Sequence, residues 1–260
     1  GQTHEQFWHK HTRMSMENIS YNGYPIREAF IKYKGKELNK DEPYPVLIRT
    51  KNDLEKDYVL ANLKRTDSKY SSNNNDIHIS LDHCDKMVTI LLGAQPAFSG
   101  TFDYVKQFYE VSKGLKSNIR YFMFVYCDGS RIKKKNLFVE ICKFIKNEKN
   151  YPKNIVIVPM SYQNDDVIAS LFFRSNVTIT RSGGQTGIEI MEVSKGANFI
   201  HSEIKNKLNM SITHEDLLKG ILKWEGGNAL LIQQRTGAEF ITPHLFSKYC
   251  KSVLASNLFK

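Results

Sequence analysis

The sequence predicts an α/β fold, a Rossmann-like open parallel sheet flanked by helices, and three observations predict it. From residue 86 onward, apolar strand-like runs alternate with helical segments at short spacing. The run 87–92 is apolar almost throughout, as in strands that are buried on both faces of a parallel sheet. A glycine turn at Ser182-Gly183-Gly184 joins a β-branched run to a helical one. Strand–helix alternation of this kind implies right-handed crossovers in one sheet.

The totals indicate a folded globular chain with a basic surface. Hydrophobic residues make up 41% of the 260 residues and aromatic residues 12%. The net charge of +10 fits nucleic acids, anionic membranes or phosphorylated ligands as partners. The excess is spread over Lys-rich helices without an aromatic-and-basic RNA pattern, so nucleic acid is not expected. Peripheral contact of a basic face with an anionic membrane stays an expectation.

The four cysteines show no CxxC pairing, so neither a disulfide framework nor a zinc site is expected. No apolar run is long enough to cross a bilayer, and no signal-peptide pattern opens the chain. A cytoplasmic-type environment is therefore expected, with secretion into a host cell left open. The chain starts at Gly1 in a polar segment without an initiator methionine, which we interpret as the start of a fragment.

The first 85 residues give weaker patterns. Residues 1–32 carry a short helical pattern and then an Asn-Gly turn followed by Pro25, the composition of a linker. Residues 33–85 are charged, rich in Asn and Ser, and poorly periodic. We expect an irregular insertion or linker there, with one helix over 52–63.

From residue 86 the elements follow in order, and we expect one domain over 86–260. The sequence predicts strands over 87–92, 120–126, 155–159, 177–180, 197–201 and 240–241. It predicts helices over 101–114, 134–147, 165–174, 229–235 and 242–256, and one after Gly184. Thr213 and Asp216 have the spacing of a helix-capping box. Ligands bind beyond the carboxyl ends of such strands, where glycine loops after Leu92, Thr180 and Trp224 could share one crevice.

The turn after Thr180 has the composition of a phosphate-binding loop. Gly183 and Gly184 permit close approach of a ligand, and the helix start offers unpaired N–H groups and a positive dipole end. Glu189, one turn further on, could reach a pair of ribose hydroxyls. The alternative is an ordinary strand-to-helix turn, in which Ser182 or Thr186 caps the helix. Arg181 could bind a phosphate or form a structural ion pair.

Residues 181–189, Arg-Ser-Gly-Gly-Gln-Thr-Gly-Ile-Glu, resemble the donor-site motif of GT-B glycosyltransferases, especially the MurG-like group. The resemblance implies that the glycine turn approaches the donor diphosphate and that the glutamate binds the ribose hydroxyls. The residues that this motif assigns to the donor are Ser182, Gly183, Gly184, Gln185, Thr186 and Glu189.

Three further pieces follow in the order of the family. Gly93 and Gln95 lie in a loop that resembles the family's Gly-Gly-Ser-Gln-Gly loop but has Ala94 and Pro96 in place of glycines. Met160 lies in the segment that holds the nucleobase in the family. Asn228 matches the Gln-x-x-Asn-Ala stretch that contacts the sugar, although the glutamine is missing. Upstream, residues 22–27 resemble the family's Gly-Asn-Pro-Val-Arg linker.

The resemblance implies the donor-binding half of a glycosyltransferase that uses a nucleotide sugar, expected to be UDP-linked, with no further cofactor and no metal. Its partner would be a missing N-terminal acceptor domain or a separate acceptor subunit, which would also hold the general base, so the catalytic residues stay unknown. Two alternatives remain. One is an epimerase or hydrolase of nucleotide sugars. The other is a degenerate domain that serves as a binding or interaction module, as Pro96 and the altered 225–228 loop would favour. His201, at a strand end near the crevice, is either a core histidine or a direct participant.

Overall fold

The computed structural model describes residues 6, 9–10, 13–19, 25–39, 42–93, 97–116, 118–128, 131–132, 135–204, 212–223 and 225–255. Within these, a parallel sheet of six strands runs in the order β11-β10-β9-β4-β5-β8. The strands are β4 (Lys86–Leu91), β5 (Tyr121–Tyr126), β8 (Ile155–Met160), β9 (Val177–Thr180), β10 (Ala197–His201) and β11 (Glu239–Ile241). This architecture confirms the predicted Rossmann-like α/β fold.

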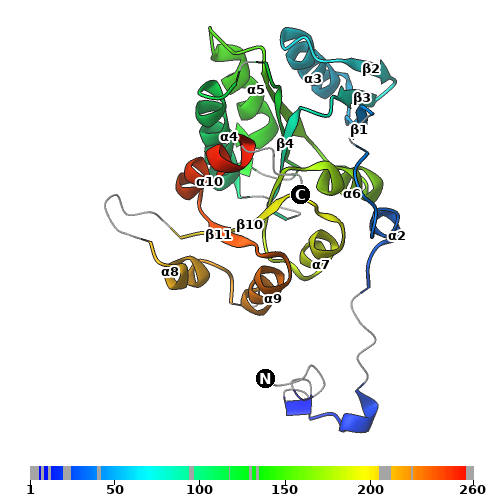
Figure 1. Cartoon of the computed structure of the whole chain (residues 1–260), viewed down its shortest axis with the longest axis vertical. Coiled ribbons are helices and arrows are strands. Elements are labelled where there is room, and N and C mark those ends of the chain that lie inside the picture. Colours follow the sequence, from blue (N-terminus) through cyan, green and yellow to red (C-terminus); the bar gives the residue numbers. More distant parts are fainter. Residues whose placement is uncertain are drawn as a thin grey trace.

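Helices cover both faces of the sheet. They are α4 (Phe98–Lys113), α5 (Leu137–Asn147), α6 (Asp165–Arg174), α7 (Gly184–Val193), α8 (His214–Lys219), α9 (Gly226–Thr236) and α10 (Pro243–Ala255). Helix α4 packs against α5 and α10, whereas α7 packs against α6 and α9. Figure 1 shows α4 and α10 on one side of the sheet and α6 and α7 on the other. The predicted helix over 134–147 begins only at Leu137, because β6 (Arg131–Ile132) and β7 (Lys135–Asn136) form a short hairpin before it.

The burial of the strands explains why the sequence predicted them correctly. All residues of β5, β8 and β9 are buried, as is every residue of β4 except the last, so apolar side chains face both helix layers. Side-chain caps fix the starts of several helices, among them α6 and α8. Asn164 accepts a hydrogen bond from the Val167 amide at the start of α6. Thr213 and Asp216 form the predicted capping box of α8.

Residues 33–85 are not irregular, which differs from the expectation. They form β1 (Tyr44–Arg49), α3 (Asp53–Arg65), β2 (Tyr70–Asn73) and β3 (Asp76–Leu81). The strands make an antiparallel sheet in the order β1-β3-β2. Alternate residues of β1 and β3 are buried, and they join the same core as the large sheet. The turn between β2 and β3 places Asn74 at a φ of 49°, a left-handed conformation that asparagine tolerates.

Helix α3 covers the outer edge of the large sheet. Strand β8 stands at the end of the strand order, and α3 packs on it. The side-chain amide of Asn62 donates to the carbonyl of Ile157, so a polar group of the open edge finds a partner. The first part of the chain therefore closes an edge that would otherwise be free to pair with another strand.

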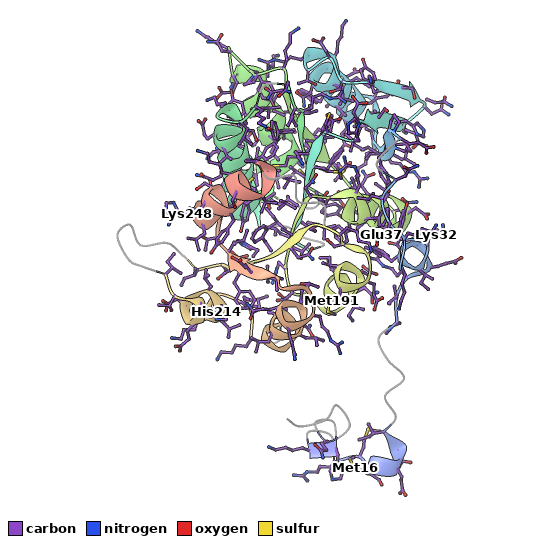
Figure 2. The ribbon with its side chains drawn as sticks, in the orientation of Figure 1. Met16, Lys32, Glu37, Met191, His214 and Lys248 are labelled. Atoms are coloured by element: carbon purple, nitrogen blue, oxygen red, sulfur yellow. The ribbon has the colours of Figure 1, made fainter. Side chains whose placement is uncertain are left out.

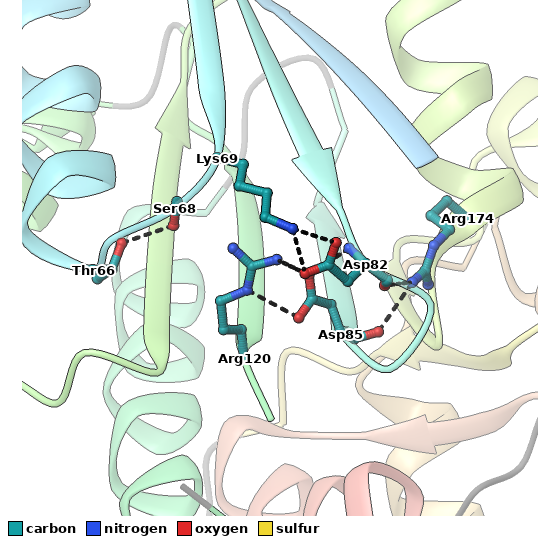
Figure 3. A network of polar contacts seen from close by, with 7 residues as sticks. All are labelled: Thr66, Ser68, Lys69, Asp82, Asp85, Arg120 and Arg174. Atoms are coloured by element: carbon teal, nitrogen blue, oxygen red, sulfur yellow. Dashed lines mark hydrogen bonds and ion pairs between the residues drawn. The ribbon is translucent and has the colours of Figure 1, made fainter. Parts of the chain in front are cut away.

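An ion network joins the two sheets at the start of β4 and β5 (Figure 3). Arg120 donates from Nη2 to Asp82 at 2.9 Å and to Asp85 at 2.6 Å. Arg174, at the end of α6, donates to the main-chain carbonyl of Asp85 at 3.0 Å. Lys69 adds an ion pair with Asp82. The network fixes the connection between β3 and β4, and with it the position of the small sheet.

Two short elements precede the small sheet, η1 (Met16–Asn18) and α2 (Glu28–Ile31). Helix α2 packs against α6 and α7. The η1 segment lies apart from the sheet, and its labelled Met16 is exposed (Figures 1 and 2). The assignment of residues 1–32 to a linker from a missing domain stays a prediction.

Candidate functional site

The strand order reverses between β4 and β9. From β4 the chain proceeds outward through β5 and β8, and from β9 it proceeds in the opposite direction through β10 and β11. In open parallel sheets the ligand crevice forms at this reversal, beyond the carboxyl ends of the strands. Leu91 of β4 pairs with Thr180 of β9, so the loops that follow these two strands start side by side.

Gly93 brings the first of these loops against the second. Its φ is +86°, a conformation that side chains rarely adopt. A Cβ atom on Gly93 would lie 4.0 Å from Cδ of Arg181, so the two loops are in contact. The predicted donor residue Gln95 lies outside the described residues.

The N-terminus of α7 opens onto this crevice without a side-chain cap. Its N-cap residue is Gly183, and a Cβ atom there would meet nothing within 4 Å. Its first amide groups therefore have no side-chain cap, and uncapped helix starts of this kind are where anions bind. Ser182 is buried with no hydrogen-bond partner on Oγ, so it does not cap α7 as the alternative interpretation required. Thr186 is half-buried in the first turn.

A third loop reaches the same place. Glu225 is the N-cap residue of α9, and its Oε1 forms an ion pair with Nη2 of Arg181 at 3.3 Å. A Cβ atom on Gly184 would lie 3.7 Å from Nδ2 of Asn228. Asn228 lies inside α9 and does not cap it. The structure therefore brings together the loops of Gly93, Gly184 and Asn228, as the sequence predicts.

Glu189 is placed differently from the expectation of an open ribose ligand. Its side chain is 0% exposed and forms two hydrogen bonds of 2.6 Å with Arg27. Gln185, also assigned to the donor, donates to Glu189 at 2.7 Å and to the carbonyl of Pro25 at 3.1 Å. The hydrogen bond to Glu189 raises the pKa of Arg27 further above its ordinary value. Both carboxylate oxygens of Glu189 therefore already have partners.

The sequence interpretation named Arg27 only as part of a linker and did not foresee this pair. Arg27 also bonds Asp165 at the start of α6. No local sequence pattern predicts a contact between residues that are 162 positions apart. The resemblance of residues 22–27 to the family's linker was the one available signal.

Comparison with known proteins gives distant likenesses only. No protein-family model matches the chain, and no curated protein matches it. Among solved structures, MurG of Acinetobacter baumannii is 13% identical with a TM-score of 0.41, covering 74% of this chain and 44% of its own. A UDP-forming trehalose-phosphate synthase of Burkholderia xenovorans is 11% identical with a TM-score of 0.38, covering 80% and 42%. The E. coli trehalose-6-phosphate protein bound with UDP-2-fluoro glucose is 9% identical with a TM-score of 0.33, covering 80% and 54%. The chain spans about half the length of these structures or less.

Met160 lies away from the crevice. It ends β8, which β5 separates from β4, and its main-chain carbonyl accepts a hydrogen bond of 2.7 Å from the Cys127 amide. The side-chain amide of the neighbouring Gln163 also has partners, because it forms hydrogen bonds with the main-chain N–H and carbonyl of Arg49. The structure therefore does not bring Met160 together with the glycine loops.

The crevice at the β4–β9 reversal thus offers N–H donors, three glycines, and one arginine that is paired with Glu225. The N–H groups can bind and stabilise an anion. Among the described residues no group of three or more His, Cys, Asp or Glu side chains could hold a metal ion. No helix in the described ranges is long and apolar enough to cross a membrane.

Proposed function

We propose that the chain is the donor-binding half of a GT-B-type glycosyltransferase that uses a nucleotide sugar, with UDP as the nucleotide. The observation that carries the proposal is the uncapped N-terminus of α7, which opens onto the reversal of the strand order and carries the 181–189 motif. Gly93 and Asn228 border the same crevice from two other loops.

The chemistry of this site is electrostatic. A donor diphosphate before α7 would accept hydrogen bonds from the first amide groups of the helix. The helix dipole would stabilise the negative charge that builds up on the diphosphate as the sugar leaves. The acceptor and its general base would come from another domain or subunit. The chain alone is therefore expected to bind nucleotide and to transfer little sugar.

The role of Glu189 in this proposal is conditional on Arg27. A ribose diol binds a carboxylate through its two oxygens, and Arg27 holds both of them here. Donor binding at Glu189 thus requires that Arg27 releases at least one oxygen. The half-exposed side chain of Arg27 has solvent into which it can turn.

The same pair favours a second candidate, a degenerate domain that serves as a binding or interaction module. A glutamate that is fully buried and ion-paired is typical of a structural residue. In that case the crevice would retain the shape of a donor site without binding a nucleoside.

Calorimetric titration of the protein with UDP, GDP and UDP-N-acetylglucosamine separates the two candidates. The glycosyltransferase proposal predicts binding of the uridine nucleotides that is lost in a Glu189→Ala variant with retained circular dichroism. Absence of binding to all three ligands would contradict it and favour the interaction module. Unchanged UDP binding by Glu189→Ala would keep the donor site but remove Glu189 from it.

A further inference from the structure

Helices α3 and α5 leave a cavity of about 520 Å³ between them, at the edge strand β8. Both helices pack on β8, but over their described residues they do not pack closely on one another. Pro159 of β8 and Asn62 of α3, both buried, belong to the lining. Small-molecule sites have volumes of roughly 300–1000 Å³, so this cavity is large enough for a ligand. None of its lining residues belongs to the proposed donor loops.

One end of the cavity is apolar. Leu54 and Tyr58 lie one turn apart on α3 and are 63% and 36% exposed, which is a large exposure for apolar side chains beside a cavity. The ring of Tyr58 contacts that of Phe138 on α5, with centroids 6.4 Å apart. Leu54 and Tyr58 also line a second cavity, so they form the wall between the two. The lining continues from this wall with Ala61, Cys142 and Ile145.

The other end of the cavity is cationic. Arg65 of α3 donates to the main-chain carbonyls of Ile145 at 2.7 Å and Glu148 at 2.5 Å. Its guanidinium therefore joins the two helices at this end and satisfies carbonyl groups at the C-terminus of α5. Lys146 and Lys149 line the same end and are exposed. Among the described residues, no carboxylate forms an ion pair with either lysine.

Two carboxylates in the lining leave this polarity in place. Glu148 accepts a hydrogen bond of 3.0 Å from the hydroxyl group of Tyr109. Asp57 precedes Tyr58 on α3 and so belongs to the apolar end. The cavity is therefore amphipathic, with apolar side chains at one end and an excess of positive charge at the other.

The bridges between the helices favour a small ligand over a helix of another protein. The contact of Tyr58 with Phe138 and the hydrogen bonds of Arg65 both join α3 to α5. Tyr58 and Arg65 are two turns apart on α3, which is about 10 Å along its axis. A helix with its side chains is itself about 10 Å wide, so it could not lie along the cavity without crossing both bridges. One alkyl chain fits between them.

We propose that this cavity binds a free single-chain anionic amphiphile of the fatty-acid type. Its alkyl chain lies against Tyr58, Ala61 and Ile145, and its carboxylate lies at Lys146 and Lys149. Removal of the chain and of the exposed apolar side chains from water drives the binding. The lysines select a negative head group over a positive one. The site is independent of the proposed donor crevice.

Decanoate is the probe, with decyltrimethylammonium as the cation that carries the same chain and acetate as the head group without a chain. Ala61→Leu fills the cavity from α3, at an exposed position that has room for a larger side chain. Ala255→Leu, the same change at the exposed end of α10, is the matched control. A double variant, Lys146→Gln with Lys149→Gln, removes both charges. Lys143→Gln on α5, outside the lining, is its control.

Calorimetric titration below the concentration at which decanoate forms micelles measures the binding. We expect one decanoate per chain, weaker binding of decyltrimethylammonium, and none of acetate. Ala61→Leu should weaken decanoate binding by about 10-fold or more, because it takes the place of buried methylene groups. The double lysine variant should weaken it by about 2- to 10-fold without weakening the cation. Ala255→Leu and Lys143→Gln should bind like the natural protein.

Three results would overturn the inference. They are no binding of decanoate, equal binding of the anion and the cation, and decanoate binding that a folded Ala61→Leu leaves unchanged. Thermal unfolding checks the fold of each variant. The methyl NMR signal of Ile145 locates the site in the natural protein, because decanoate should shift it, and an unshifted signal would place the ligand elsewhere.

Other occupants give different results. Self-association of the natural protein that Ala61→Leu abolishes would assign the cavity to a second copy of the chain and overturn the amphiphile. UDP titrations of the same variants separate this inference from the donor site. UDP binding should be the same in all of them, and its absence would contradict the proposed function without affecting the decanoate result.

Discussion

The guanidinium of Arg27 and the carboxylate of Glu189 form two hydrogen bonds of 2.6 Å that join the segment before α2 to the middle of α7. Glu189 is fully buried, and Arg27 is the cation that pairs with it. The same α7 has an uncapped N-terminus at the crevice. The pair therefore links the stability of the N-terminal segment to the helix that would bind a donor.

Removal of Arg27 should be costly to the fold. Arg27→Ala leaves the buried carboxylate of Glu189 with Gln185 as its remaining side-chain partner. We expect the free energy of unfolding to fall by about 3 kcal/mol. This is the low end of the range for a broken buried ion pair, because Arg27 is half-exposed. Chemical denaturation measures it, with Lys32→Ala as the control. The Lys32–Asp166 pair is exposed and screened by solvent, so its loss should change the free energy of unfolding far less. Equal effects of the two variants would contradict the buried role of Glu189.

Gly196 should not tolerate a side chain. A Cβ atom there would collide with the main-chain carbonyl oxygens of Ser175 and Asn176. We expect Gly196→Ala to lower the free energy of unfolding by about 1–3 kcal/mol, as overpacking does. Gly227→Ala, with nothing within 4 Å of its Cβ atom, is the control and should be neutral or stabilising in its helix. A neutral Gly196→Ala would mean that the connection from α7 to β10 approaches Ser175 and Asn176 less closely than described.

Asp85 should respond to pH in the direction opposite to a typical paired carboxylate. Burial raises the pKa of Asp85 above its ordinary value of 3.8, against the hydrogen bonds from Arg120. The native state therefore binds this proton more tightly than the unfolded state. The contribution of Asp85 to stability should rise as the pH falls through the raised pKa toward 3.8. NMR titration of the carboxyl group measures the midpoint, and a midpoint at or below 3.8 would contradict the burial.

The thiols should differ sharply in reactivity. Cys84 is exposed, whereas Cys127, Cys142 and Cys250 are buried, and burial raises the pKa of Cys142 to about 12. A thiolate is the reactive form. We expect one fast-reacting thiol in the folded protein with a thiol-specific reagent, and none in Cys84→Ser. Four fast thiols in the native protein would show that the core opens readily.

The sequence was most informative where local chemistry decides structure. Strands buried on both faces left continuous apolar runs, and the Thr213–Asp216 spacing marked a helix start that the structure confirms. The small antiparallel sheet was missed although Ile77, Ile79 and Leu81 alternate with polar residues in β3. Surrounding Asn, Ser and charged residues obscured this period, because β2 is fully exposed and carries no apolar signal.

The candidate site was predictable only in part. The loops of Gly93, Gly184 and Asn228 converge because parallel strands bring their carboxyl ends to one edge. Contacts made by side chains far apart in sequence were not predictable. Arg27 forms hydrogen bonds with Glu189, and Gln163 with the main chain of Arg49, through tertiary packing that no local pattern encodes.

The central claim is that an anionic donor binds at the N-terminus of α7, and Gly183→Asp tests it most directly. The position has a φ of −60° and open space, so aspartate fits as an N-cap, and stability should stay equal or rise by a few tenths of a kcal/mol. The same carboxylate would take the place of the phosphate and repel it. We predict that calorimetry shows UDP binding to the natural protein and none to a fully folded Gly183→Asp. UDP binding that Gly183→Asp leaves unchanged would contradict the claim.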